Sequence, residues 1–388
     1  MSEKKIIDLK KEKTVRIAKK VLRFLRIPIM ILIVLAALLF CAKMLGSVAV
    51  SNLTDGINSI KLAVSSGDGY PYVLENFNVR ELSSVDGRPL IVYKDSCLVL
   101  DSTADTMLDC QIPVADSKVN VKNGRVFVYS NSSPQYVIHG KTEKLAEGRV
   151  DGNITAAALA KNGSFAVSYS AEKVQSVVSV YNPRQKMIFS WNCSNERVVD
   201  VSLSDNGKKV AIIAVGTENA EFYSRVIVFD VNGKEPSADV RYEGTLMLKV
   251  HFASSSRIIA VGDNKTVVVS RKGEVIDELA YSNDSIKAVV PDDKGNLLVA
   301  FSESGGARTG LVRFSRSGKR SCETDIEGTP DCYALGSREI VVSDDSIVTV
   351  YNFKGEVKET VNANGNVFGI ELSSNAIYTL ENGVVCKY

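Results

Sequence analysis

From about Tyr70 to the C-terminus the sequence repeats one kind of unit, and this repeat limits the possible folds more than any other feature. Each unit holds two pairs of short Val/Ile/Leu/Tyr-rich runs bounded by Gly, Asn, Asp and Ser, the pattern of strands and turns. ITAAALAKNGSFAVSY at Ile154–Tyr169 is an example of a first pair, and VIVFDVNGKE at Val226–Glu235 of a second. The third run of each unit is centred near residues 98, 137, 178, 226, 268, 311, 348 and 384. Four short strands in about 40 residues predict a β-propeller blade rather than a sandwich, whose strands do not recur so regularly.

The spacing predicts an all-β, eight-bladed propeller over residues 70–388, with seven blades as the alternative. The last unit is incomplete, because the chain stops after the runs Val367–Leu380 and Gly383–Tyr388. The segment Tyr70–Asn76 stands just before the first complete unit and is the expected donor of the missing outer strand. Such closure leaves no open strand edge where the two ends of the ring meet.

One N-terminal transmembrane helix is expected before the propeller. Ile27–Ala42 carries no charge and is almost entirely apolar, and with Lys43 snorkelling to the interface the span runs over 27–50. Residues 1–26 hold ten Lys/Arg against three Asp/Glu, which predicts a basic cytoplasmic tail and an extracytoplasmic C-terminal domain. The tail is interpreted as an orientation signal, with an interfacial helix or binding arm as the alternative. A flexible linker at 51–69 would join span and propeller. A cleaved signal peptide ending at Ser47-Val48-Ala49 is the rival hypothesis.

Charge and motif content exclude several functions. The basic tail leaves residues 27–388 with a net charge of −5, which does not suit nucleic-acid binding. The two histidines, His139 and His251, lie in strand-like runs more than a hundred residues apart and are expected to be sheet residues. Asp292-Asp293 and Asp344-Asp345 lack the alternating spacing of a calcium loop and indicate turns. No nucleophile elbow, phosphate-binding Gly loop or Cys-x-x-Cys is present, so neither cofactor nor metal is predicted.

On these repeats, the chain resembles the WD40- and quinoprotein-like β-propellers. Its whole layout is similar to bacterial single-span membrane proteins with an extracytoplasmic propeller, grouped as a domain family of unknown function. The sequence departs from both repeat types, because no Trp-Asp dipeptide closes the blades and Trp191 is the only tryptophan. One tryptophan cannot form the repeated packing of quinoprotein enzymes, which argues against quinone chemistry. The resemblance implies a binding or scaffolding role.

Propeller geometry separates tight turns on one face from longer, variable loops on the other. The longest variable loops are expected at Gly216–Ser224 and Ser302–Gly310, either as recognition elements or as solvated insertions. Aromatic and Arg side chains dominate binding hot spots. The candidate partner-binding residues in or directly beside these two loops are therefore Glu218, Glu221, Phe222, Tyr223, Arg225 and Arg308.

The cysteines indicate whether the propeller lies in an oxidising or a reducing compartment. Cys97 and Cys110 are equidistant from an expected turn, and Cys322 and Cys332 flank a link between units, so either pair could form a disulfide in an oxidising exterior, with free buried thiols as the alternative.

The leading hypothesis is a membrane-anchored, non-enzymatic scaffold that binds an envelope or membrane protein. A module that binds cell-wall glycan is the alternative, and an extracytoplasmic hydrolase or lyase with carboxylates converging on the central funnel is the third.

Overall fold

The computed structural model describes residues 30, 33, 54–58, 67–75, 78–111, 116–282, 285–302, 306–373 and 376–388. The expected tail at 1–26 lies outside these residues, as does the expected span at 27–50 apart from Met30 and Ile33. Among the residues described, no helix has the length and apolar character needed to cross a membrane. The chain divides into two compact units, Met1–Thr54 and Asp55–Tyr388, and the second contains all the strands that the structure describes.

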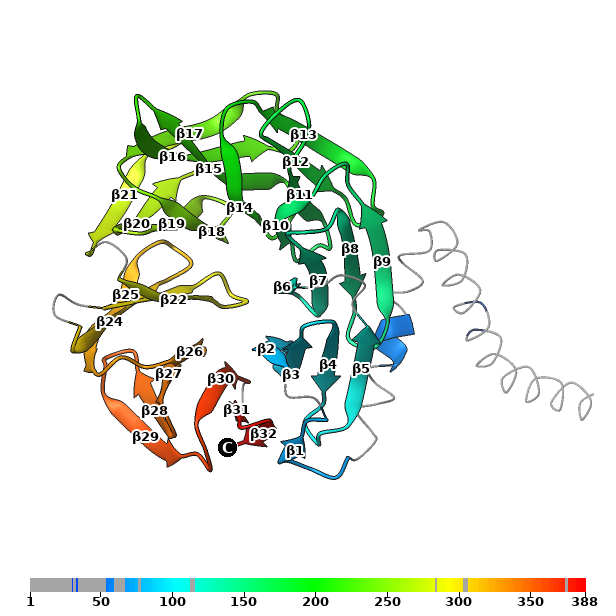
Figure 1. The fold of residues 1–388 in the computed structure, drawn as a ribbon, viewed down its shortest axis with the longest axis vertical. Coiled ribbons are helices and arrows are strands. Elements are labelled where there is room, and N and C mark those ends of the chain that lie inside the picture. The colour runs from blue at the N-terminus through cyan, green and yellow to red at the C-terminus, as the bar shows by residue number, and fades with distance from the viewer. Residues whose placement is uncertain are drawn as a thin grey trace, which may run out of the picture. The chain divides into compact units, whose positions relative to one another are not determined.

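The second unit is a ring of eight antiparallel sheets with four strands each, the blades of a β-propeller (Figure 1). Within each blade the strands follow one another in chain order from the centre of the ring outwards, except where the eighth blade takes its outer strand from β1. Blades 1 to 4 comprise β2–β5 (Val79–Val85, Arg88–Tyr93, Ser96–Leu100, Thr106–Gln111), β6–β9 (Ser117–Lys122, Arg125–Ser130, Gln135–His139, Lys144–Arg149), β10–β13 (Ile154–Leu159, Phe165–Tyr169, Ser176–Tyr181, Met187–Cys193) and β14–β17 (Arg197–Leu203, Lys209–Glu218, Glu221–Asp230, Pro236–Glu243). Blades 5 to 8 comprise β18–β21 (Met247–Ser254, Arg257–Gly262, Lys265–Ser270, Val275–Ala280), β22–β25 (Ile286–Pro291, Leu297–Ser302, Arg308–Phe314, Arg320–Glu327), β26–β29 (Cys332–Leu335, Glu339–Asp344, Ile347–Asn352, Val357–Asn362) and β30–β32 (Val367–Leu372, Ile377–Glu381, Val384–Lys387) with β1 (Tyr72–Val73).

The ring closes as the sequence predicts, with the N-terminal strand completing the last blade. β1 pairs with β32 in the register Tyr72↔Val385 and Val73↔Val384, and the Leu74 N–H donates to the Gly383 carbonyl at 3.0 Å. The blades number eight, as predicted, rather than seven. Each of the eight expected third-strand centres falls inside the third strand of its blade.

Eight apolar clusters hold the ring together, one between each pair of neighbouring blades. In most blades the two middle strands are buried on both faces, so their sequences are continuous apolar runs such as VAIIA at 210–214. The outer strands are polar by comparison, and β29 has no fully buried residue. No blade can bury both of its faces alone, and this makes the closed ring the stable arrangement.

The turns divide between two faces of the ring. The tight-turn face carries the turns that join the first to the second and the third to the fourth strand of each blade. The variable face carries the turns between second and third strands and the links between blades. Glycines occupy the positive-φ positions of most tight turns, as at Gly163 and Gly273. Gly233, in the turn between β16 and β17, does not have a positive φ.

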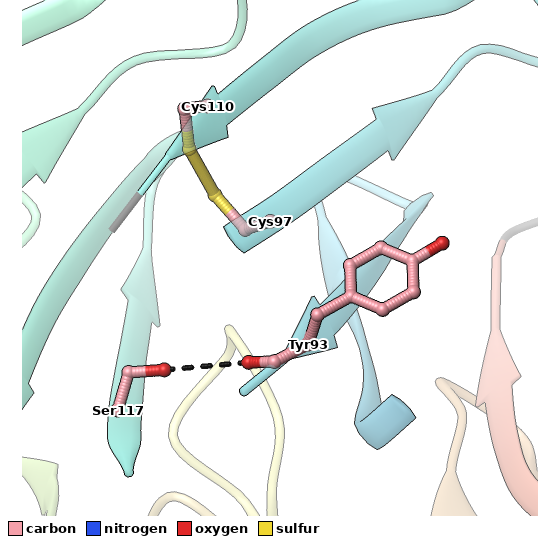
Figure 2. Close-up of a disulfide and its surroundings, with 4 residues drawn as sticks. All are labelled: Tyr93, Cys97, Cys110 and Ser117. Carbon is pink, nitrogen blue, oxygen red and sulfur yellow. Dashed lines mark hydrogen bonds between the residues drawn. A yellow bond between two sulfur atoms is a disulfide. The ribbon is translucent and has the colours of Figure 1, made fainter. Parts of the chain in front are cut away.

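One of the two expected cysteine pairs is bonded. Cys97 and Cys110 are register partners on β4 and β5 and form a disulfide across the two strands, with Cα atoms 5.4 Å apart (Figure 2). Beside this bond, the Ser117 hydroxyl donates to the Tyr93 carbonyl at 3.4 Å and joins the start of blade 2 to blade 1. Cys322 and Cys332 are free thiols on β25 and β26, so the proposed second bridge is absent.

Candidate functional site

The segment expected to be the longest loop is a strand extension instead. β15 and β16 continue through most of Gly216–Ser224 and are paired without a break to Glu218↔Glu221, leaving only a two-residue turn at Asn219 and Ala220. Both turn residues have positive φ, 51° and 66°, as the tight hairpin turns that match strand twist require. Thr, Phe and Tyr favour strands, and pairing satisfies the backbone groups that a nine-residue loop would expose. Similarly, Arg308, Thr309 and Gly310 belong to β24 rather than to a loop.

We call this hairpin, together with the adjoining part of β17, the blade 4 extension (residues 216–225 with 239–243). A cavity of about 520 Å³ lies beside it. Its walls come from the end of β13, the link from blade 3 to blade 4, and the outer two strands of blade 4. The link belongs to the variable face, so the cavity lies at that face near the rim of the ring. The lining residues are Trp191, Asn192, Cys193, Ser194, Asn195, Glu196, Tyr223, Arg225, Asp239 and Arg241.

Arg225 is the centre of the cavity's polar network. Its Nη1 lies 2.8 Å from both carboxylate oxygens of Glu196, and its Nε donates to Asp239 at 2.9 Å while Nη2 pairs with the other oxygen of Asp239. Glu196 is only 5% exposed, so its charge depends on this guanidinium. The hydrogen bonds to Asp239 and then to Glu196 raise the pKa of Arg225 above its ordinary value, against the effect of burial. The network ties the blade link to both outer strands of blade 4.

A second arginine covers the aromatic side of the cavity. The Arg241 guanidinium carbon lies 3.6 Å from the centre of the Tyr223 ring, and its nitrogens donate to Glu243 at 2.6 Å and Glu218 at 2.5 Å. Tyr223 lies across its register partner Gly216, where a Cβ atom would be 2.6 Å from the tyrosine hydroxyl. Glycine at position 216 therefore permits the ring to pack against the extension. The result is a charge-paired surface built on paired strands rather than on a loop.

The thiol in the cavity is a weak nucleophile. Burial raises the pKa of the Cys193 thiol to about 12, and its hydrogen bond to Glu196 at 3.2 Å acts in the same direction. The thiol therefore stays protonated near neutral pH and is a poor nucleophile. Both arginines are already paired with carboxylates. Among the residues that the structure describes, no three His, Cys, Asp or Glu side chains group in a way that could hold a metal ion.

The two histidines are sheet residues, as expected, in β8 and β18. Burial lowers the pKa of both His139 and His251 to about 4, with Lys144 and Lys122 acting in the same direction. Neither lies in the cavity.

The predicted site residues separate into three groups. Tyr223 and Arg225 line the cavity, and Glu218 joins them through Arg241. Glu221 and Phe222 are exposed at the tip of the extension, with Phe222 42% exposed. Arg308 is exposed on blade 6 and does not line the cavity.

Sequence reasoning missed eight residues of the cavity, and the four that carry its charge and aromatic surface are Trp191, Glu196, Asp239 and Arg241. The alternating charges of Asp239, Arg241 and Glu243 on one strand were an available signal, because a period of two places all three on one side. No comparable local signal marks Glu196, whose partner Arg225 is 29 residues away.

Carboxylates also occur on the innermost strands. Burial raises the pKa of Glu371 on β30 to about 8, and the carboxylate of Glu81 on β2 acts in the same direction. Burial likewise raises the pKa of Asp200 on β14, although Lys249 lies 4.0 Å away and opposes the shift. These acids lie on the innermost strands of three different blades. A carboxylate cluster that lines the central funnel, as the hydrolase or lyase hypothesis expects, would be built from such strands.

Comparisons with known proteins agree with the fold. A protein-family model described as "Family of unknown function (DUF5711)" matches residues 75–383. Sqt1 from Saccharomyces cerevisiae is similar in structure, with a TM-score of 0.57, 9% identity, and coverage of 84% of this chain and 99% of Sqt1. BamB from Moraxella catarrhalis has a TM-score of 0.51 and 11% identity over 81% of this chain and 99% of BamB. No curated protein matches the sequence. At these identities the similarities concern the β-propeller fold alone.

Proposed function

The chain belongs to the DUF5711 family of unknown function, and from that premise we propose that it is a membrane-anchored, non-enzymatic scaffold whose variable face binds another protein at the cell envelope. The blade 4 extension is the proposed contact surface, with the adjoining cavity as the pocket that receives a partner side chain.

The preformed geometry of the blade 4 extension carries this proposal. Phe222 exposes an aromatic ring at its tip, beside a cavity walled by Trp191, Tyr223 and two ion-paired arginines. Exposed aromatic residues next to a structured pocket are typical of interface hot spots. A surface held by paired strands loses little conformational entropy on binding, which favours affinity.

The disulfide supports the extracytoplasmic part of the proposal. Structural disulfides persist in oxidising compartments and are rare in reducing ones. The Cys97–Cys110 bond joins two strands of one blade, and it agrees with the orientation that the basic N-terminal sequence predicts.

Site-specific photo-crosslinking in the native membrane tests the scaffold proposal. A photoreactive residue at Phe222 of the full-length protein is expected to capture a defined protein. The matching variant replaces residues 217–222 with Asn-Gly, so that a two-residue turn joins the register partners Gly216 and Tyr223. This variant keeps the hairpin and both cavity residues, Tyr223 and Arg225. A photoreactive residue at Glu243, which is exposed on the adjoining strand, is placed in both the wild type and this variant and reports whether capture depends on the removed tip.

A photoreactive residue at Arg308 on blade 6 is the spatial control. Capture of the same partner at Phe222 but not at Arg308 supports the blade 4 extension as the contact surface. Capture of no protein at either position, in membranes where the protein is abundant, contradicts the scaffold proposal.

A glycan is the second candidate ligand, and the cavity lining favours it over other small molecules. Trp191 and Tyr223 offer faces for a sugar ring, while Asn192, Asn195 and Asp239 offer hydrogen-bonding groups. Retention of the protein on purified cell-wall material, at least tenfold weaker in Trp191→Ala and unchanged in the Asn-Gly variant, would replace the protein ligand with a glycan. Equal retention of both variants would contradict the glycan.

A further inference from the structure

A buried carboxylate connects the segment before the propeller to blade 2. Residues 54–58 form one helical turn, and Asp55 in this turn is only 8% exposed. Its oxygens accept hydrogen bonds from the backbone N–H groups of Lys141 and Thr142 at 3.1 and 2.7 Å, and from the Thr142 hydroxyl at 2.8 Å. These donors lie in the turn between β8 and β9, more than 80 residues along the chain, on the tight-turn face.

A second attachment follows on the neighbouring blade. The Gly67 N–H donates to the Thr103 hydroxyl and the Gly69 N–H to the Thr103 carbonyl, both at 3.0 Å. Thr103 lies in the turn between β4 and β5, which occupies in blade 1 the position that the β8–β9 turn occupies in blade 2. The Tyr70 hydroxyl donates to the Asp101 carbonyl of the same turn at 2.7 Å.

The blade 2 turn is shaped and charged for the Asp55 carboxylate. A Cβ atom on Gly140 would lie 2.5 Å from the carboxylate of Asp55, so this position must be glycine for the carboxylate to reach the turn. Burial lowers the pKa of Arg125 on β7, and the charges of Asp55 and Asp86 oppose that shift, which places a guanidinium in the field of the docked carboxylate. Hydrogen bonds from several donors to an ionised carboxylate are among the stronger contacts in proteins.

We infer that the turn at 140–143 is a docking site for Asp55 of the chain's own lead segment, by which we mean the described residues 54–58 and 67–70. The chain then enters the propeller attached along the tight-turn faces of blades 2 and 1. The expected flexible linker at 51–69 is then attached to the propeller at both ends. This attachment leaves the variable face, with the blade 4 extension, on the side away from the point of entry. That consequence for partner recognition rests on the proposed function, whereas the docking itself does not.

Hydrogen–deuterium exchange of the full-length protein tests the docking through the amides of Lys141 and Thr142. In Asp55→Ala these two amides are expected to exchange at least tenfold faster than in the wild type. Gly140→Ala leaves Asp55 unchanged but blocks its approach, and it is expected to give the same increase. Asp68→Ala removes an exposed carboxylate from the same lead segment and is expected to leave both amides unchanged.

The blade 5 turn at 271–274 is the internal reference for folding, because it lies far from blade 2 in the ring (Figure 1). Faster exchange at 141–142 with an unchanged reference in both variants supports the docking. Wild-type amides that already exchange as fast as those of Asp55→Ala would overturn it, and so would an Asp68→Ala effect equal to that of Asp55→Ala. Partner capture at Phe222 is measured separately, so a failed docking and a failed scaffold are distinguishable.

Discussion

At the scale of single residues, two arginines of the blade 4 extension differ in their contribution to stability, because the burial of their carboxylate partners differs. Arg225 and Arg241 face each other in the register of β16 and β17, and each contacts two carboxylates. The partners of Arg241 are exposed, whereas Glu196 beside Arg225 is buried. Removing Arg225 leaves a carboxylate without its counter-charge in a low-dielectric environment, and removing Arg241 does not.

Arg225→Ala is therefore expected to lower the free energy of unfolding by about 2–4 kcal/mol. Arg241→Ala, the matched control on the next strand, is expected to lower it by about 1 kcal/mol or less. Urea denaturation of both variants at neutral pH measures the difference. Equal losses would contradict the assigned role of Glu196.

His139 makes a prediction about pH. Neither of its ring nitrogens hydrogen-bonds to a residue that the structure describes, and burial lowers its pKa to about 4. Below the ordinary pKa of about 6.5 the unfolded chain binds a proton that the folded chain does not, so stability falls with decreasing pH down to about 4. Between pH 7 and 5 this histidine is expected to account for about 2 kcal/mol of lost stability.

The variant His139→Phe isolates this contribution, because all other groups titrate alike in both proteins. Urea denaturation at pH 7 and pH 5 is expected to show a drop in unfolding free energy that is about 2 kcal/mol smaller in the variant than in the wild type. An identical drop in the two proteins would mean that His139 is protonated normally in the fold.

At the scale of elements, the strands follow directly from local sequence, but their irregularities do not. Six of the eight inner strands contain a bulge near their first residues, as between Val79 and Glu81 of β2 and between Met247 and Lys249 of β18. A bulge increases the twist and re-aims the side chains that follow. Similarly, the extension of β15 and β16 was mistaken for a loop because Gly216 and Asn219 are common in loops, while cross-strand pairing with Tyr223 decides the outcome.

The disulfide between β4 and β5 makes a prediction at this scale. The bond closes a loop with a sequence separation of 13. A cross-link of that size stabilises the folded state by about 3 kcal/mol, because it lowers the conformational entropy of the unfolded chain. The double variant Cys97→Ala/Cys110→Ala is expected to lose about this much, measured by urea denaturation. Dithiothreitol is expected to lower the midpoint of the wild type and not that of the variant. An unaltered wild-type midpoint under full reduction would contradict a stabilising role.

At the scale of the whole molecule, stability depends on closing the ring with a strand from the other end of the chain. Leu74 is 2% exposed and packs between blades 8 and 1, next to the pairing of β1 with β32. Without this closure, β32 would present an unpaired edge.

Leu74→Ala is expected to lower the free energy of unfolding by about 2–5 kcal/mol and to favour concentration-dependent association through the freed edge. Val73→Ala is the control at the preceding residue, the last of β1, because Val73 is 67% exposed and a change there is expected to cost about 0.5 kcal/mol or less. Urea denaturation and light scattering measure the two effects. Equal stability of both variants would mean that the closure contributes little.

The sequence by itself determined the eight four-stranded units and the strand that closes the ring, and it offered Cys97 with Cys110 as one of two possible disulfides. These features depend on residues close in sequence, or on a repeat that local strand and turn preferences make visible. It also pointed to Tyr223 and Arg225, which are aromatic and basic residues beside a candidate turn.

Only the tertiary structure decided that Glu196 and Asp239 complete the cavity around Arg225, and that Asp55 bonds to the turn of blade 2. These partners are between 14 and 87 residues apart. No local preference encodes such contacts, because they depend on strand pairing within blade 4, on the link from blade 3 to blade 4, and on the return of residues 54–58 to a turn of blade 2.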